Sequence, residues 1–422
     1  MGGWSPWALD PGLRSTTGFT VNLRFMHIVD YWAGVPLCLA VSAVDRVRGW
    51  LASPPPDPPG RMLLIELSEM GSAVLACSAI REAVSRLGAD NVWFLIFERN
   101  REGVSVLGLI PDGHILTVDD RSFGGFLATV LRALARCRAE RIDTAVDLEL
   151  FSRATALLAY LSGARIRSGL SAGRNEGLYR GSFFSHPVLY SPHHHMTRTY
   201  LALVRAAFAP RSNGEPLLKE PVATDDAPLP RFQASREVID SIDRVLADRP
   251  AGSRLVFFNP DPGLLPLRAW PEQHFARLGA LLTVAFPDVV VAVVGVERAG
   301  PIADRILSGL PSERRLNLAG RTRTLAELLE LFSRGTALVT IDSGPAHLSG
   351  LTDIFRVVLF GPETPRLYGP AGDRVEVCHA GLPCSPCFSA ANHRTSACTD
   401  NQCLRQITPE QVFETLRPAL GT

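Results

Sequence analysis

From residue 61 onward, short uninterrupted hydrophobic runs alternate with longer segments whose apolar positions recur at helical spacing. Runs such as 62–67 and 92–97 have the length and hydrophobicity of strands that are buried on both faces. Segments such as 73–87 and 126–137 place their apolar residues on one helical face instead. The alternation predicts a parallel sheet whose strands are joined by right-handed helical crossovers.

This alternation stops once and then resumes. Residues 210–230 are rich in Pro, Asp, Asn and Gly and have no apolar period, which is typical of an interdomain linker. A helix is expected at 234–247, and a strand at 255–258 followed by a helix at 271–286 begins a second α/β region. The predicted domains are therefore an N-terminal segment 1–60, an α/β domain 61–209, a linker and helix 210–252, and an α/β domain 253–422.

The N-terminal segment contains an apolar stretch at residues 25–51, in which the longest uncharged run, 31–44, is too short to span a bilayer. Two interpretations remain open: an amphipathic helix packed on the body, or a helix lying in a membrane interface. Trp32 and Trp50 flank the apolar stretch and favour the interface. No secretory signal is evident, so we expect a cytoplasmic protein that contacts the inner face of the cytoplasmic membrane through this segment. The proline-rich residues 53–60 predict a stiff spacer.

The charge balance excludes several classes of function. The 422 residues carry 43 Lys and Arg against 42 Asp and Glu, without the basic excess typical of nucleic-acid binders. Lys219 is the only lysine, and it lies in a proline-flanked segment without glycines. This excludes a Walker A phosphate loop and argues against Schiff-base catalysis. The chain also lacks a G-x-G-x-x-G dinucleotide fingerprint.

The strongest local motif is the segment 339–348, in which a strand ends at Asp342 and small residues open a helix. Free N–H groups at such a helix start bind anions, and Ser343 and Gly344 allow a phosphate to approach closely. His347 falls on the first turn, where its ring can add a hydrogen bond. The alternative is an ordinary strand–helix junction capped by the side chain of Asp342 or Ser343.

Other segments of the second domain accompany this motif. They are Asn259-Pro260 after the first strand, Arg268-Ala269-Trp270-Pro271, Phe360-Gly361-Pro362-Glu363-Thr364-Pro365, and Tyr368-Gly369-Pro370. In this order and spacing, the sequence resembles the heptosyltransferase-like glycosyltransferases of family 9, which have the GT-B fold of two Rossmann-like domains facing a cleft. The turn at 64–71 resembles the first strand–helix loop of that family. The resemblance covers about residues 61–415.

The resemblance implies an inverting transfer, without a bound metal, from a nucleotide-diphosphate sugar such as ADP-heptose to a lipopolysaccharide-core or related acceptor. Arg268 stands where the family usually has lysine, and an arginine can bind phosphate bidentately, so we expect it at the diphosphate. Glu297 is placed like the acidic residue that binds the ribose hydroxyls, although a solvated helix-start charge explains it equally well. The expected donor site therefore comprises Asn259, Arg268, Glu297, Asp342, Ser343, Gly344 and His347.

The catalytic base departs from the family pattern. Where the family has the aspartate that takes the proton of the acceptor hydroxyl, this chain has Ser72, which cannot act as a base without a partner. Glu69 lies three residues earlier in the same loop, and we hypothesise that it is the base. Asp147 and Glu149 are alternatives, and a homologue that binds sugar nucleotides without catalysing transfer is the competing interpretation.

The remaining patterns are weaker. Four cysteines near the C-terminus, Cys384, Cys387, Cys398 and Cys403, suffice in number for zinc, but their spacing is unlike a zinc ribbon and favours free thiols or a disulfide. Ser171 lies in a G-x-S-x-G sequence that would suit an α/β hydrolase, but the following residues lack helical character. Residues 193–195 are three histidines at the start of an apolar helix, and we expect them to face the cleft.

Overall fold

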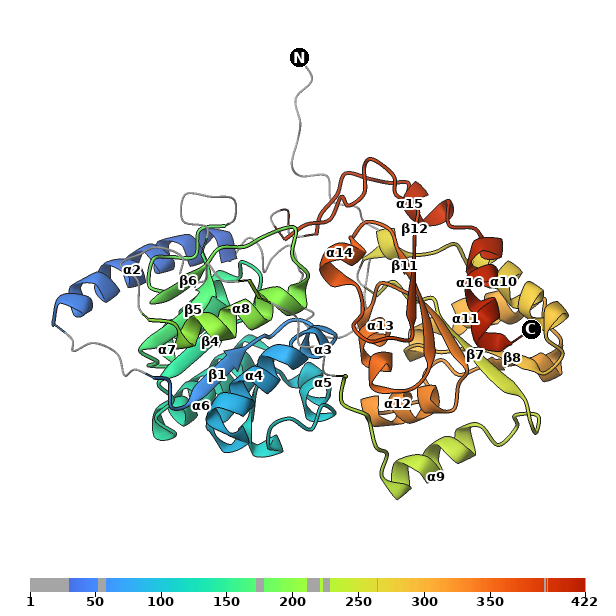
Figure 1. The fold of residues 1–422 in the computed structure, drawn as a ribbon, viewed down its shortest axis with the longest axis horizontal. Coiled ribbons are helices and arrows are strands. Elements are labelled where there is room, and N and C mark those ends of the chain that lie inside the picture. Colours follow the sequence, from blue (N-terminus) through green and yellow to red (C-terminus); the bar gives the residue numbers. More distant parts are fainter. Residues whose placement is uncertain are drawn as a thin grey trace, which may run out of the picture.

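The computed structural model describes residues 30–51, 58–171, 178–210, 221–222, 228–263, 265–390, 392 and 394–421. Two α/β domains lie next to each other, each built on one six-stranded parallel sheet with helices on both faces (Figure 1). The predicted two-domain parallel architecture is confirmed. Most of the predicted linker and of the proline-rich spacer lies outside the described residues.

The N-terminal sheet has the strand order β3-β2-β1-β4-β5-β6. Its strands are β1 (Met62–Ile65), β2 (Val92–Phe97), β3 (Ile115–Val118), β4 (Thr144–Asp147), β5 (Ile166–Leu170) and β6 (His186–Val188). The chain moves outward from β1 to β3 and then returns to β4 on the other side of β1. In open α/β sheets, ligands bind beyond the carboxyl ends of the strands at this reversal.

Helices cover both faces of this sheet because alternate strand residues point to opposite sides. The helices are α3 (Ser72–Leu75), α4 (Cys77–Leu87), α5 (Arg101–Ser105), α6 (Phe123–Ala139), α7 (Arg153–Leu161) and α8 (Met196–Phe208). Met62 and Leu64 pack with α4 and α8, while Leu63 and Ile65 pack with α6 and α7. Both faces are thus buried, as the uninterrupted hydrophobic runs predict.

Helix α2 (Gly34–Leu51) packs on α7. Cys38 is fully buried, the Ser42 hydroxyl accepts a hydrogen bond from the Ser182 N–H (2.9 Å), and Asp45 pairs with Arg167 (2.8 Å). The segment therefore is a helix packed on the body, although its outer face keeps exposed apolar side chains. None of the helices in the described part of the chain is both long and apolar enough to cross a membrane.

The C-terminal sheet has the strand order β12-β11-β10-β7-β8-β9, with the same reversal between β7 and β10. Its strands are β7 (Arg254–Asn259), β8 (Val289–Val293), β9 (Arg315–Asn317), β10 (Ala337–Ile341), β11 (Phe355–Phe360) and β12 (Val375–His379). Its helices are α9 (Arg236–Val245), α10 (Glu272–Ala285), α11 (Gly300–Leu307), α12 (Leu325–Ser333), α13 (Gly344–Leu348), α14 (Pro365–Tyr368), α15 (Gln402–Arg405) and α16 (Pro409–Leu420). Helix α9 packs on α12, where Ser241 donates a hydrogen bond to Glu327 (2.8 Å).

Short 3-10 turns complete the two domains. They are η1 (Ala89–Asn91), η2 (Glu98–Asn100), η3 (Asp112–His114), η4 (Pro266–Arg268), η5 (Glu297–Ala299), η6 (Ser312–Arg314) and η7 (Ser349–Leu351). Two of them carry residues that the sequence analysis assigned to the donor site: η4 carries Arg268 and η5 carries Glu297.

Candidate active site

The two domains meet at the carboxyl ends of their central strands, where α3 faces α13 (Figure 1). Gly71, at the start of α3, lies so close to the C-terminal domain that an added β-carbon would be 3.0 Å from His347 Cδ2. The same atom would be 3.3 Å from the Cα of Gly344. The loop that follows β1 and the turn that follows β10 therefore form opposite walls of one site.

The turn after β10 holds Asp342 and Ser343. Ser343 is the N-cap residue of α13, but its side chain does not cap the helix. Its hydroxyl instead lies 3.3 Å from Asn259 Nδ2 and 3.1 Å from Thr340 Oγ1. The expected alternative of a side-chain cap is therefore wrong, and the hydroxyl ties the turn to the end of β7.

Arg268 reaches this turn from η4. Its Nη1 donates to the backbone oxygen of Asp342 (3.3 Å), and its Nη2 lies 3.3 Å from Asp342 Oδ2. The same Nη2 donates to Glu363 Oε1 at 3.1 Å. The structure thus brings together Arg268 and Asp342, which the sequence predicted for one site. The Arg268 side chain is 15% exposed.

Glu363, which the sequence analysis did not assign to the site, joins this pair from the loop after β11. Its side chain is 1% exposed, and burial, with a contribution from the nearby Asp342, raises its pKa to about 7. The available signal was its place in the Phe360–Pro365 motif, where a carboxylate directly follows a buried strand. A carboxyl with this pKa is partly protonated at neutral pH, which limits the negative charge beside Arg268.

Arg394 was also missed, and it links the two domains. Its guanidinium pairs with Glu69 of the N-terminal domain, and its Nε lies 3.0 Å from Glu363 Oε1. It also lies over the ring of Tyr368, 5.5 Å from the centroid. The other oxygen of Glu69 accepts a hydrogen bond from Ser72 (3.3 Å). A continuous polar chain therefore runs from Arg268 through Glu363, Arg394 and Glu69 to Ser72.

Two further carboxylates support the loop that carries Glu69. Glu149 accepts hydrogen bonds from the backbone N–H groups of Leu67 (2.9 Å) and Ser68 (2.8 Å). Glu66 is buried and accepts from the N–H of Glu69 at 3.3 Å. Burial first, and then the charge of Glu149, raises the pKa of Glu66 well above its usual value. These contacts fix the loop. The Glu69 side chain is 39% exposed and is the most exposed acidic side chain of the loop.

Histidine and tyrosine side chains complete the walls. Burial, assisted by the charges of Arg356, His195 and Arg268, lowers the pKa of His347 to about 3, so its ring is neutral. His195 caps α8 and contacts the backbone oxygen of Gly369 through Nε2 (2.8 Å), so this histidine faces the other domain, whereas His193 and His194 are exposed. Tyr200 of α8 is buried, and its burial raises the pKa of its hydroxyl.

Unpaired buried atoms concentrate in this region. Among the described residues, nine buried side-chain nitrogen or oxygen atoms have no hydrogen-bond partner. Five of them belong to residues of the site: Glu66 Oε2, Arg268 Nε, Asp342 Oδ2, His347 Nδ1 and Glu363 Oε2. Of these, Asp342 Oδ2 keeps an ion contact with Arg268 Nη2 at 3.3 Å. Because buried polar groups are almost always paired, this concentration indicates that the site is built to receive a polar ligand.

Other residues singled out by sequence lie elsewhere. Glu297 is exposed on η5, beside Gly320, where a β-carbon would be 3.0 Å from the Glu297 Cα. Asp147 is fully buried and paired with Arg180. Ser171 follows β5, and residues 172–177 after it lie outside the described residues.

The four C-terminal cysteines are free thiols: Cys384 and Cys398 are exposed, Cys387 is half-buried and Cys403 is buried. In the part of the chain that the structure describes, no three His, Cys, Asp or Glu residues form a group suited to hold a metal ion.

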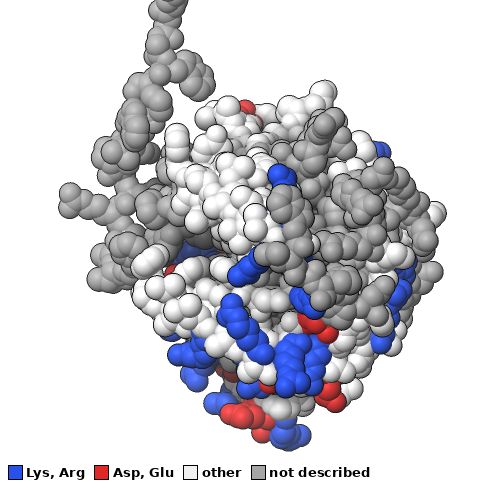
Figure 2. All heavy atoms as spheres, turned by 90° about the vertical axis from the view of Figure 1, so that its left-hand side faces the viewer, with Lys and Arg blue, Asp and Glu red and all other residues white. Residues whose placement is uncertain are grey.

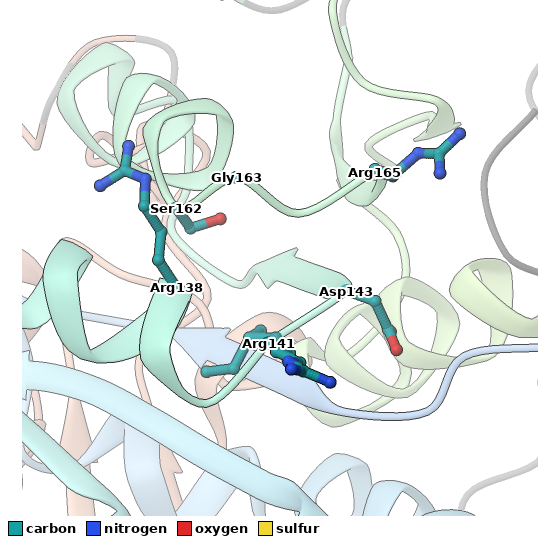
Figure 3. Close-up of a pocket in the computed structure, with 7 residues that line it drawn as sticks. Arg138, Arg141, Asp143, Ser162, Gly163 and Arg165 are labelled. Carbon is teal, nitrogen blue, oxygen red and sulfur yellow. The ribbon is translucent and has the colours of Figure 1, made fainter. Parts of the chain in front are cut away.

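A separate pocket of about 290 Å³ lies at the opposite, amino end of the N-terminal sheet (Figure 3). Arg138, Arg141, Arg165 and Asp143 line it, and the Asp143 carboxylate accepts hydrogen bonds from the N–H groups of Gly60 and Arg61. This position is far from the carboxyl ends of the strands, where such sheets bind their ligands.

Sequence comparison identifies relatives of this chain. The model of glycosyltransferase family 9 (heptosyltransferase) matches residues 130–397. Lipooligosaccharide heptosyltransferase 2 of Haemophilus influenzae is 29% identical over 186 residues, which are 43% of this chain and 51% of that protein. Lipopolysaccharide heptosyltransferase 2 of Salmonella typhimurium is 30% identical over 170 residues, 40% of this chain and 47% of that protein. The chain thus matches about half the length of these curated relatives.

Solved structures share the fold over most of the chain. ADP-heptose lps heptosyltransferase II of E. coli has a TM-score of 0.65 at 21% identity and covers 85% of this chain and 98% of its own. The family 9 glycosyltransferase of Veillonella parvula has a TM-score of 0.65 at 17% identity, covering 86% and 97%. The E. coli heptosyltransferase WaaC with ADP has a TM-score of 0.60 at 16% identity, covering 85% and 99%. The predicted GT-B architecture is confirmed.

Proposed function

The chain belongs to glycosyltransferase family 9, the heptosyltransferase family, and we propose that it transfers a heptose-like sugar from a nucleoside diphosphate to a lipopolysaccharide-core or related acceptor. ADP-heptose is the first donor to test, because the solved structures that share this fold include an ADP-heptose heptosyltransferase and a heptosyltransferase with ADP. The observation that carries the proposal is the group of five buried polar atoms, contributed by both domains, that have no hydrogen-bond partner.

The reaction proposed here is a single displacement at the anomeric carbon. The acceptor oxygen forms a bond to that carbon, the bond from carbon to phosphate oxygen breaks, and the electron pair leaves with the nucleoside diphosphate. One displacement inverts the configuration. The leaving diphosphate needs positive charge, and Arg268 and Arg394 are the cations at the site that supply it without a bound metal.

The proton of the acceptor hydroxyl passes to Glu69 in this proposal. Its carboxylate is the exposed acid of the loop, and Ser72 orients it through a hydrogen bond of 3.3 Å. Asp147 is less suited, because it is fully buried and paired with Arg180. Glu149 is less suited as well, because its Oε1 already accepts two backbone N–H groups. A general base must be within hydrogen-bond reach of the proton it takes.

We assign the donor site to the residues that the sequence predicted for it. Arg268 faces the diphosphate, and Gly344 leaves room for it because it lacks a side chain. Asn259, Asp342 and Ser343 shape the turn that holds it. The neutral His347 ring contributes a hydrogen bond rather than a charge. Glu297 remains the candidate for the ribose hydroxyls, on an exposed turn after β8.

A thermal-shift screen of nucleoside diphosphates and nucleotide sugars tests the donor, and a transfer assay with ADP-heptose and lipopolysaccharide-core acceptors tests the reaction. We expect stabilisation by ADP and ADP-heptose, and release of ADP only when acceptor is present. Stabilisation without transfer would support a binding protein that has lost activity. If no nucleoside diphosphate stabilises the chain, the proposal fails.

A membrane-surface contact through the outer face of α2 is a further part of the proposal. Its exposed apolar side chains are Leu37, Leu39, Val44 and Val47, and Trp32 precedes them; two arginines, Arg46 and Arg48, lie among them. Figure 2 shows this side of the molecule, where a broad uncharged area lies above a region rich in basic side chains. Apolar residues beside arginines suit the interface of an anionic bilayer.

Sedimentation with vesicles of phosphatidylglycerol and phosphatidylethanolamine tests this contact. We expect binding that weakens in salt and is lost when Leu39 and Val47 are both changed to glutamate. Val284→Glu is the matched control, because Val284 is 84% exposed on α10 of the other domain. Equal binding by the double variant and the control would contradict the membrane contact.

A further inference from the structure

Two guanidinium groups converge on a single buried oxygen in this site. Arg268 Nη2 lies 3.1 Å and Arg394 Nε lies 3.0 Å from the same atom, Glu363 Oε1. Two like charges held this close repel each other unless an anion lies between them. Besides Glu363, Asp342 lies against Arg268 and Glu69 lies against Arg394, so each guanidinium group contacts a second carboxylate. A diphosphate that binds here therefore competes with these carboxylates for the two guanidinium groups.

The turn that presents Arg394 is built to hold it in place. Asn392 accepts a hydrogen bond from the Ser389 N–H (2.9 Å) and donates one to the Cys387 backbone oxygen (2.9 Å). The Arg394 N–H donates to the Ser389 backbone oxygen at 3.1 Å. Arg394 itself has φ of 54°, a left-handed conformation that is costly for a residue with a β-carbon. Such a conformation persists only where its surroundings hold it, and it clusters at functional sites.

The contact of Arg394 with Glu69 limits the proposed role of Glu69 as a base until a ligand displaces Arg394. A carboxylate paired with an arginine is a weaker base than a free one, because the positive charge favours its ionised form. Glu69 therefore cannot act efficiently while Arg394 holds it. The donor carries the anion that competes for Arg394, namely its diphosphate, and an arginine binds phosphate more strongly than a point cation does, through two parallel hydrogen bonds.

We propose that Arg394 is a second donor-binding cation, which passes from Glu69 to the sugar-proximal phosphate of the donor and so frees Glu69 for the acceptor. This inference rests on the proposed function. It gives the reaction an order, since the acceptor-side base becomes available only after the donor has bound. Arg268 then holds the opposite side of the diphosphate from the turn after β10.

Calorimetric titration of the full chain with ADP and with AMP tests this assignment. Arg394→Gln should weaken ADP binding about tenfold or more, since hydrogen bonds to charged groups are among the strong ones, and should change AMP binding much less because AMP lacks the second phosphate. The ADP affinity of Arg394→Lys should lie between those of the wild type and Arg394→Gln. Arg405→Gln is the matched control, because Arg405 pairs with Asp400 on the exposed surface of α15.

A double-variant cycle separates the proposed exchange from simple charge repulsion. Glu69→Gln should tighten ADP binding by releasing Arg394, and this gain should disappear when Arg394→Gln is also present. A gain that persists in the double variant would show repulsion alone and would overturn the exchange. Unchanged ADP affinity in Arg394→Gln, with intact wild-type binding, would overturn the inference and leave the proposed function standing. Wild-type protein that binds no ADP would overturn both.

Discussion

Gly71 of the N-terminal domain lies against His347 of the C-terminal domain, so closely that a β-carbon at position 71 would be 3.0 Å from His347 Cδ2. The φ of Gly71 is −68°, which any residue adopts, so the demand for glycine comes from space and not from the backbone. The distance between the loop that carries Glu69 and the turn that carries Asp342 therefore depends on the absence of one methyl group.

Gly71→Ala should lower the turnover number about tenfold, because small displacements of reacting groups reduce rates strongly, while the melting temperature changes little. Gly113→Ala is the matched control, since nothing lies within 4 Å of a β-carbon there. Steady-state kinetics of both variants provide the measurement. A turnover number in Gly71→Ala equal to that of the control would show that the close approach has no role in the reaction.

Glu69→Gln should reduce transfer by about 10²-fold or more, the usual contribution of a general base, while ADP binds at least as tightly as it does to the wild type. The amide keeps the shape and the hydrogen bond from Ser72 but cannot take a proton. Glu98→Gln, at the exposed end of the neighbouring strand β2, is the control. Undiminished turnover in Glu69→Gln would exclude Glu69 as the base and return attention to Glu149.

Hydrophobic runs predicted the central strands well because both faces of each strand are buried. The run at 92–97 corresponds to β2, and the helix at 196–208 corresponds to α8. The predicted helix at 73–87 is divided at Ala76 into α3 and α4. Strand β5 was missed because Arg167 and Ser168 interrupt its apolar pattern, and their polar groups are satisfied by distant partners, among them Asp45 and Leu203.

The site was predictable only where its residues lie in local motifs. Asp342, Ser343 and His347 occupy one strand–helix turn, and Arg268 was recognised by its motif. Glu363 also lies in such a motif, but its contacts with Arg268 and Arg394 depend on tertiary folding. The pairing of Arg394 with Glu69 joins residues more than three hundred positions apart. Local spacing carries no information about such a contact.

Arg180→Met should destabilise the fold by about 3–5 kcal/mol, because it leaves the Asp147 carboxylate buried without its counter-charge. Both side chains are almost completely buried, and Arg180 also donates to the backbone oxygen of Ser152 (2.9 Å). Arg121→Met removes an exposed pair with Asp119 and should destabilise the fold far less, because solvent screens an exposed ion pair. Urea unfolding of both variants is the measurement, and equal losses would contradict the buried pair as a stabilising element.

Glu363 should make the fold less stable as the pH rises. Burial raises its pKa to about 7, well above the usual value of 4.5, so the folded chain keeps a proton that the unfolded chain releases. The stabilisation is fully present below the unfolded pKa and is lost as the pH rises through the folded pKa. Asp147, whose pKa burial raises to about 6, adds to the same trend.

Glu363→Gln should therefore flatten the fall in free energy of unfolding between about pH 4.5 and 7, by at most about 1.4 kcal/mol for each pH unit. Glutamine mimics the protonated carboxyl and does not titrate. Glu272→Gln is a control of opposite sign, because its hydrogen bonds from Arg305 lower the pKa of Glu272, so its small contribution is lost as the pH falls. Melting temperatures across this pH range give the comparison. Parallel curves for wild type and Glu363→Gln would show that Glu363 is ionised in the folded chain, and the two arginines would then face a full negative charge.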